Sequence, residues 1–366
     1  MLIVACISGH GYGHLSRTAS ILTALHGLQP DWRLVLSTPL PLEALRGSFG
    51  PVPFEHRACR WDVGVVQADA LGADAGATLA ALEALEIALP RQISREAAWL
   101  ASQGEPVLVV GDVPPAAAAL AQALGAPLIW VGNFGWDAIY RPMGGAFLAW
   151  ADRALQAYRQ GQALIECPFA MVMDWAIPHW PVGLTAGRPR LDGASVRARL
   201  GLDTPTERTV LVGFGGMGFP LPAELFGLWP DHHFLVTEPA LAAAAANATL
   251  LPPGLRPLDG MPVCGRVLTK PGYSTFCEAL SQGLGVHLVR REGFAEAPVL
   301  EAALQAHGRH RLLSRDQLLA GDWQLDQPLQ PAGGSPLPAD GADQAASLLD
   351  EFIQQTITQN CCAAGT

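Results

Sequence analysis

Charged residues are scarce in this chain. Only 15% of its 366 residues are Asp, Glu, Lys or Arg, and the formal net charge is −10 at pH 7. Lys and Arg form no cluster, which argues against a nucleic-acid partner because nucleic-acid-binding domains carry a basic face. A small phosphate site is still compatible with this composition, since it needs only a few local donors.

The sequence also lacks paired cysteines and long apolar runs. Its seven cysteines are an odd number without a Cys-x-x-Cys motif, which is typical of reduced thiols in a cytosol rather than of disulfides or a zinc site. The first residues lack the charged n-region and long apolar core of a signal peptide. The longest uncharged stretch, 113–136, is interrupted by prolines and glycines, unlike a membrane span. We therefore expect a cytoplasmic protein.

Short apolar segments alternate with helical segments, a pattern that indicates βαβ units around parallel sheets. Strands are predicted at 2–7, 33–36, 107–110, 128–131, 209–212, 233–236, 267–268 and 286–289. Helices are predicted at 15–28, 116–124, 274–282 and 345–355. A segment rich in Pro and Gly at 174–190 is interpreted as an interdomain linker.

The pattern as a whole predicts an α/β fold with two Rossmann-like, doubly wound domains that face each other across a cleft. The length suits two domains of ordinary size. We place them at residues 1–180 and 190–345, followed by a closing helix and tail at 346–366. Ligands bind at the carboxyl ends of the strands in such sheets, so we expect a ligand in the cleft.

A loop rich in glycine and histidine follows the first predicted strand. Residues 8–14 read Ser-Gly-His-Gly-Tyr-Gly-His, and Gly11 and Gly13 would let the backbone approach a ligand at the start of the helix. The loop is not a dinucleotide fingerprint, since His14 stands where the third glycine would be, and no Gly-Lys-Ser/Thr follows to make a P-loop. His10 or His14 could take a proton from an acceptor hydroxyl. Alternatively, they only hydrogen-bond the loop or cap the helix.

Two segments of the second half could hold a nucleotide. The loop at 212–218 contains Gly215, Gly216 and Gly218, whose amides could contact a diphosphate, although this loop alone could also be a simple tight turn.

The second segment is the predicted strand-to-helix turn at 269–280. It carries Lys270, Gly272, Ser274, Thr275 and Glu278. Ser274 and Thr275 would open the helix, and Glu278 lies one turn later on the same face as Ser274. Its carboxylate could accept hydrogen bonds from the hydroxyls of a ribose, or it could simply be solvated on a well-capped helix.

Polar residues also follow two predicted strands of the first half. Asp112 follows one, and Asn133 and Asp137 follow the next, so these three side chains could line the side that binds an acceptor. Asp112 could orient a histidine or act as a base itself. It could equally cap the helix that follows.

A metal clamp for a diphosphate lacks its usual ligands, because the sequence contains no Asp-x-Asp motif. We therefore expect neither a metal nor a cofactor. The charge of a leaving diphosphate would then be met by backbone amides, Lys270 or Arg266, with Arg290 and Arg291 as further candidates.

Taken together, these residues resemble the GT-B fold glycosyltransferases. The Gly-x-Gly-Tyr-Gly-His start and the Gly-Tyr-Ser-Thr-x-x-Glu-Ala segment are similar to family 28, which contains the N-acetylglucosaminyltransferase of peptidoglycan synthesis. They are more similar to the glycosyltransferase-like N-terminal region of plant L-arabinokinases, which segments 112–114, 133–137 and 290–298 also resemble. The resemblance covers about residues 1–310. No galactokinase-type domain follows in this sequence, so we do not expect sugar-kinase activity.

This resemblance implies a hexosyltransferase-type enzyme that is inverting, independent of metal, and uses a nucleotide sugar, in particular a UDP-sugar. Glu278 would hold the donor ribose, 215–218 and 274–275 the diphosphate, and His14 would lie near the reacting centre. The peptidoglycan enzyme continues with a Gln-x-x-Asn pair that reads the donor sugar, whereas this chain has Glu296-Ala297-Pro298. Glu296 is therefore a candidate contact to the sugar.

Two other functions stay open at the level of sequence, because one fold hosts several chemistries. The protein could be a sugar-nucleotide epimerase or hydrolase, or it could bind sugar nucleotides without catalysis. The acceptor is not named by the sequence, nor is the oligomeric state, and a peripheral membrane contact with a lipid-borne acceptor stays open.

Overall fold

The computed structural model describes residues 1–66, 74–215, 221–291 and 294–364. Contacts divide the chain into two compact units. Unit 1 comprises Met1–Val66, Ala73–Thr185 and Asp340–Thr366, and Ala186–Ala339 belong to unit 2. Both units have parallel sheets, so the predicted α/β class with two doubly wound domains is confirmed.

The sheet of unit 1 has seven strands in the order β3-β2-β1-β4-β5-β6-β7. Their bounds are β1 (Leu2–Ile7), β2 (Arg33–Ser37), β3 (Glu55–Arg57), β4 (Val107–Asp112), β5 (Leu128–Gly132), β6 (Ala163–Glu166) and β7 (His179–Pro181). Every residue of β1 and β5 is buried, because helices cover both faces of a doubly wound sheet and its strands are therefore apolar throughout. The strand order reverses between β1 and β4, which is where such sheets bind ligands.

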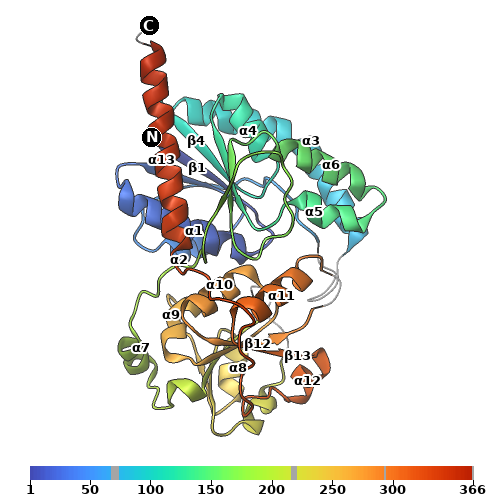
Figure 1. The fold of residues 1–366 in the computed structure, drawn as a ribbon, viewed down its shortest axis with the longest axis vertical. Helices are drawn as coiled ribbons and strands as arrows, with labels where there is room; N and C mark the ends of the chain where they lie inside the picture. The colour runs from blue at the N-terminus through green and yellow to red at the C-terminus, as the bar shows by residue number, and fades with distance from the viewer. Residues whose placement is uncertain (67–73, 216–220, 292–293, 365–366) are drawn as a thin grey trace. The chain divides into compact units, whose positions relative to one another are not determined.

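The helices of unit 1 include one that returns from the end of the chain. The bounds are α1 (Tyr12–Leu28), α2 (Leu42–Phe49), α3 (Ala75–Ala101), α4 (Ala117–Leu124), α5 (Trp136–Tyr140), α6 (Phe147–Tyr158) and α13 (Gly341–Ala364). Figure 1 shows α13 beside α1, and the Gln29 side chain just after α1 donates a hydrogen bond to Asp350 of α13 at 2.9 Å. Across the described ranges, no helix combines the length and the apolarity needed to cross a bilayer.

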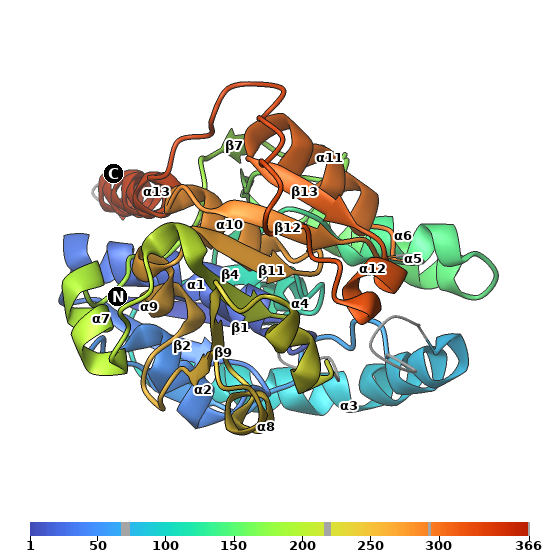
Figure 2. The same ribbon diagram turned by 90° about the horizontal axis from the view of Figure 1, so that it is seen from below.

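Unit 2 repeats the same architecture with six strands in the order β10-β9-β8-β11-β12-β13. The strands are β8 (Thr209–Gly213), β9 (His233–Val236), β10 (Ala248–Leu250), β11 (Arg266–Thr269), β12 (Gly285–Val289) and β13 (His310–Leu313). The helices are α7 (Gly193–Leu200), α8 (Pro239–Ala244), α9 (Pro257–Gly260), α10 (Tyr273–Ser281), α11 (Ala297–His307) and α12 (Arg315–Ala320). Figure 2 shows β11, β12 and β13 in this order. The order reverses between β8 and β11, so the loops after these strands lie at a second switch point.

All eight predicted strands overlap observed strands, and the boundary between the units, at Thr185, lies within the predicted linker, but part of this linker is a strand. Residues 179–181 form β7, which pairs in parallel with β6. The linker interpretation was wrong for these residues, because a short edge strand between prolines carries a turn-like composition.

Candidate functional site

Helix α1 presents three polar side chains to the end of β4. The helix begins at Tyr12 after the extended residue Gly11, and His14, Arg17 and Thr18 follow at intervals of three and four, which places them on one face. All three are buried. Ile7 of β1 lies opposite Asp112 of β4 in the sheet, so the glycine loop after β1 leads directly to Asp112.

Asp112 is the centre of a buried network of donors. Its side chain is fully buried. The Oδ1 atom lies 2.8 Å from Nδ1 of His14 and also accepts from Nη2 of Arg17. The Oδ2 atom accepts from Nε of Arg17 at 3.1 Å and from the hydroxyl of Thr18 at 2.6 Å. The remaining Nη1 of Arg17 donates to Oδ1 of Asn133 at 2.7 Å.

The charge of Asp112 determines which ring nitrogen of His14 carries the proton. Burial by itself would raise the pKa of Asp112, but the positive charge of Arg17 and the hydrogen bonds from His14 and Arg17 outweigh it and hold the pKa at about 2. The carboxylate is therefore ionised at neutral pH and can only accept hydrogen bonds. Nδ1 of His14 then carries the proton, which leaves Nε2 as the basic nitrogen of the ring.

This geometry bears on the three interpretations of Asp112 that the sequence left open: orienting a histidine, acting as a base, and capping the next helix. Helix α4 has Ala116 as its N-cap residue and no side-chain cap, so the capping role is wrong. Asp112 instead contacts His14, as the interpretation of Asp112 as a partner of a histidine predicts, and its role as a base itself stays a prediction.

Strained backbone flanks this network on two sides. Val113, directly after Asp112, has a φ of +64°, and Phe169 has a φ of +61°. A β-branched residue rarely adopts this left-handed conformation, which persists only where the surroundings enforce it. The Val113 carbonyl accepts a hydrogen bond from the Tyr158 hydroxyl at 2.7 Å, and the Phe169 carbonyl accepts one from the Asn133 amide at 3.5 Å. The backbone around Asp112 and Asn133 is thus held by specific contacts.

His10 belongs to a second group of contacts in the same loop. Its Nδ1 accepts a hydrogen bond from the Val65 amide at 3.3 Å, and its ring meets Trp136 edge-on with 5.2 Å between centroids. The indole of Trp136 donates to the carboxylate of Asp62 at 2.8 Å. Asp62 is buried, and this burial raises its pKa. At Gly64, with a φ of +71°, a side chain would collide with the His10 ring, so only glycine fits.

Asp137, the other acceptor-side prediction, lies in the first turn of α5. Its side chain is 9% exposed, and burial raises its pKa. It lies beside Gly135, where an added side chain would meet Asp137, Trp175 and Tyr158. A role for Asp137 in acceptor binding stays a prediction.

In unit 2, the switch point brings several predicted residues together. Gly213 and Thr269 pair at the carboxyl ends of β8 and β11. Lys270 follows, and its Nζ lies 3.9 Å from where a Cβ of Gly215 would be. Burial lowers the pKa of Lys270, and the charge of Arg291 lowers it further. The lysine therefore lies beside Gly215.

Helix α10 begins beside this lysine. Gly272 is its N-cap, and Ser274 and Thr275 lie in its first turn, so the N-terminus of the helix is next to Lys270. Glu278 follows one turn later and is half-buried. Of the predicted diphosphate loop, Gly216 and Gly218 lie outside the described residues.

Of the arginines predicted to meet the charge of the diphosphate, Arg266 lies at the other end of its strand and Arg290 is paired with a carboxylate. Arg266 begins β11, at the amino end of the strand, and it donates to Nε2 of His287 at 2.9 Å. This candidate was wrong, because a four-residue strand separates it from the switch point. Arg290 forms an exposed ion pair with Glu301 at 2.9 Å, whereas the Arg291 guanidinium lies over the Phe294 ring at 4.5 Å.

Glu296, the candidate sugar contact, is the N-cap residue of α11 and is buried. Its assignment stays a prediction. Over the described parts of the chain, no group of three or more His, Cys, Asp or Glu side chains is arranged to hold a metal ion.

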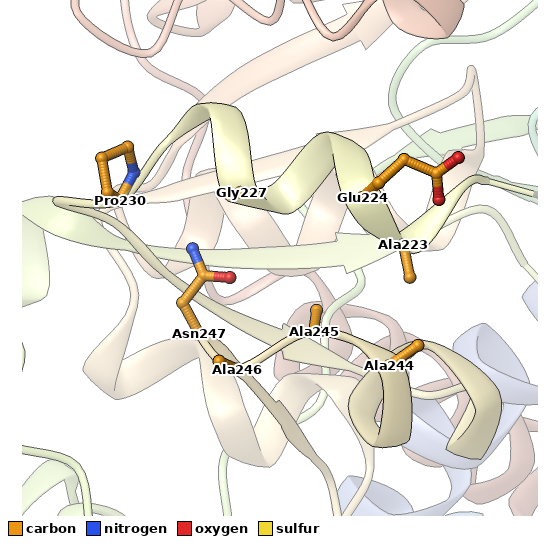
Figure 3. Close-up of a pocket in the computed structure, with 8 residues that line it drawn as sticks. All are labelled: Ala223, Glu224, Gly227, Pro230, Ala244, Ala245, Ala246 and Asn247. Carbon is orange, nitrogen blue, oxygen red and sulfur yellow. The ribbon is translucent and has the colours of Figure 1, made fainter.

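A surface pocket in unit 2 lies apart from these residues in the sequence (Figure 3). It is lined by Ala223, Glu224, Gly227, Pro230, Ala244, Ala245, Ala246 and Asn247. The Asn247 amide is occupied with the carbonyls of Phe226, Trp229 and His232 at 3.0–3.1 Å. Glu224 is the one ionisable group among the eight lining residues, so the pocket offers no cation to an anionic ligand.

Comparison with known proteins gives one relative in sequence. The chain is 27% identical over 376 residues to L-arabinokinase of Arabidopsis thaliana, an alignment that covers 98% of this chain and 34% of that protein. The chain thus spans about a third of the length of the curated relative it matches. No family model matches the chain.

Solved structures resemble the chain over nearly its whole length. A UDP-glucosyltransferase from Polygonum tinctorium matches with a TM-score of 0.62 and 14% identity, covering 94% of this chain and 92% of its own. UDP-glucose:anthocyanidin 3-O-glucosyltransferase matches with a TM-score of 0.61 and 11% identity, covering 97% and 94%. The glycotransferase of kitacinnamycin matches with a TM-score of 0.60 and 16% identity, covering 96% and 98%. The chain therefore has the fold of the GT-B glycosyltransferases.

Proposed function

We propose that this protein is a glycosyltransferase that moves a sugar from a nucleotide sugar, in particular a UDP-sugar, to a hydroxyl group of an acceptor. The observation that carries the proposal is the contact between His14 and Asp112. An ionised, buried carboxylate holds one ring nitrogen of His14, and the other nitrogen is the basic one. A histidine oriented in this way is suited to general-base catalysis.

In the proposed reaction, Nε2 of His14 takes the proton of the acceptor hydroxyl. The acceptor oxygen forms a bond to the anomeric carbon of the donor, and the bond from that carbon to the diphosphate oxygen breaks. The electron pair of this bond leaves with the nucleoside diphosphate. A single displacement inverts the configuration at the anomeric carbon. Asp112 stabilises the imidazolium that forms, as an acidic partner does in other catalytic pairs.

The donor belongs to unit 2 in this proposal. The amide groups at Gly215 and at the start of α10 lie beside Lys270, and together they would meet the charge of the leaving diphosphate without a metal. Glu278 would accept hydrogen bonds from the ribose hydroxyls. Glu296 would contact the transferred sugar.

A panel of nucleotide sugars tests the function directly. The protein is first screened by thermal shift against UDP-, GDP- and dTDP-sugars, since a ligand stabilises the folded state in proportion to its binding. Each donor that binds is then incubated with and without a set of hydroxylated acceptors. We expect nucleotide release that depends on the acceptor. A donor converted without an acceptor would indicate an epimerase or hydrolase instead, and binding without turnover would indicate a binding protein.

His14→Ala should lower turnover by about 10²–10⁴-fold, the usual contribution of a positioned general base. Its affinity for UDP, measured by calorimetry, should stay unchanged, because the nucleotide is proposed to bind unit 2. His26→Ala is the matched control, since His26 lies in the last turn of the same helix and should leave turnover unchanged. Near-normal turnover of His14→Ala would remove the base from the mechanism.

Glu278→Ala should weaken UDP binding by about 1–3 kcal/mol, because hydrogen bonds to a charged group are lost. Isothermal titration calorimetry measures the difference. Glu207 lies just before the amino end of β8, whereas UDP is proposed to bind at the carboxyl ends of the strands. Glu207→Ala therefore serves as the control with unchanged affinity. Equal affinities of the wild type and Glu278→Ala would place the ribose elsewhere.

Lys270 is the only lysine of the chain, so the accessibility of its amine can be measured by chemical labelling with and without UDP. An amine-reactive reagent can modify only this side chain and the α-amino group of Met1. Because its pKa is lowered, Lys270 should react at a lower pH than an ordinary lysine. UDP should protect Lys270 while the reaction of Met1 continues, as followed by mass spectrometry. Equal labelling of Lys270 with and without saturating UDP would contradict a role at the diphosphate.

A further inference from the structure

The proposed reaction makes no use of Arg17, although Arg17 makes more contacts to Asp112 than His14 does. The Arg17 side chain is 2% exposed. Its Nε and Nη2 donate to the two carboxylate oxygens of Asp112, and its Nη1 donates to Asn133. This fork-like pairing with a carboxylate is specific to arginine, since lysine offers only a single charged point. The charge that faces His14 is therefore already compensated.

Arg17 also lies close to the histidine ring itself. Its Nη2 is 3.3 Å from Nδ1 of His14. A neutral ring tolerates this neighbour, whereas a protonated ring places a second positive charge beside the guanidinium. A nearby like charge disfavours the charged form of a group, and a nearby opposite charge favours it. Arg17 and Asp112 thus act on His14 in opposite directions.

Two other side chains near His14 come from different elements of unit 1. Asp112 comes from β4, and Asp62, in the loop after β3, interacts electrostatically with His14. The ring of Phe134, after β5, meets the His14 ring edge-on with 5.7 Å between centroids and carries no charge. On α1 itself, Arg17 is the charged neighbour and Thr18 is neutral. Asp62 and Phe134 are unchanged in all variants of the test, so their effect on His14 is the same in each.

We propose that Arg17 is a positioning residue that sets the basicity of His14. It locks Asp112 in the orientation that holds Nδ1, and its positive charge opposes that of the carboxylate beside the imidazole ring. This proposal rests on the proposed role of His14 as general base.

The test is a double-mutant cycle on the pKa of His14. Wild type, Arg17→Met, Asp112→Asn and the double variant are labelled at the ten histidines, and the rings are titrated by NMR, with His14→Gln assigning the signal. Arg17→Met should raise the pKa of His14 by about 1–3 units, the usual effect of a neighbouring charge. Asp112→Asn should lower it. The double variant, which has lost both charges, should return close to the wild type.

Two controls separate electrostatics from stability. Arg57 pairs with the buried carboxylate of Glu96 at 2.7 and 3.0 Å, so Arg57→Met removes a comparable ion pair from the same unit. It should lower stability and leave the titration of His14 unchanged. Arg17→Lys keeps the charge but loses the fork, so the pKa of His14 should stay closer to the wild type than in Arg17→Met.

An unchanged pKa of His14 in a folded Arg17→Met protein would overturn the proposal and leave Arg17 a structural ion pair. If Arg17→Met does not fold because a buried charge is left unpaired, the comparison moves to Asp112→Asn and the double variant. The double variant must then show the higher pKa, and equal values would overturn the proposal. Titration needs no substrate, so this outcome is independent of whether the protein transfers sugar.

Discussion

The candidate site of unit 1 depends on one buried carboxylate. Asp112 lies at the end of a central strand and is fully buried, so its charge would be costly there without partners. A single turn of α1 supplies those partners from His14, Arg17 and Thr18. Because all donors come from one rigid helix, the orientation of the His14 ring follows from the packing of α1 on the sheet. The proposed base therefore does not have to be ordered by a substrate.

Much of the fold and part of the site could be predicted from sequence. The strands of a doubly wound sheet are apolar throughout, which makes them conspicuous, and their carboxyl ends mark where ligand-binding loops must lie. His14 and Asp112 were predicted as site residues for this reason, and the structure places them in contact. What the pattern could not supply was the pairing of β1 with β4, which brings together two residues that are 98 positions apart.

Arg17, Thr18 and Asp62 were not predicted from the sequence as residues of the site. Arg17 and Thr18 belong to no motif, and helical spacing from His14 was the only signal that could have found them. Asp62 follows β3, a three-residue strand too short to show a periodic pattern. Arg266 was wrongly proposed as a partner of the diphosphate. It lies at the amino end of β11, whereas the predicted ligand site lies at the carboxyl end of the strands.

Because α13 returns to unit 1, a single cut in the chain cannot separate the two units. Unit 2 is inserted into unit 1, since the chain leaves after Thr185 and comes back at Asp340. Cutting only one of these two connections would leave the pieces covalently joined through the other. A fragment ending at Thr185 would, in addition, lose the partner that covers α1, the helix that carries the proposed base. Dissection of this protein therefore calls for a circularly permuted or spliced unit 1, rather than simple truncation.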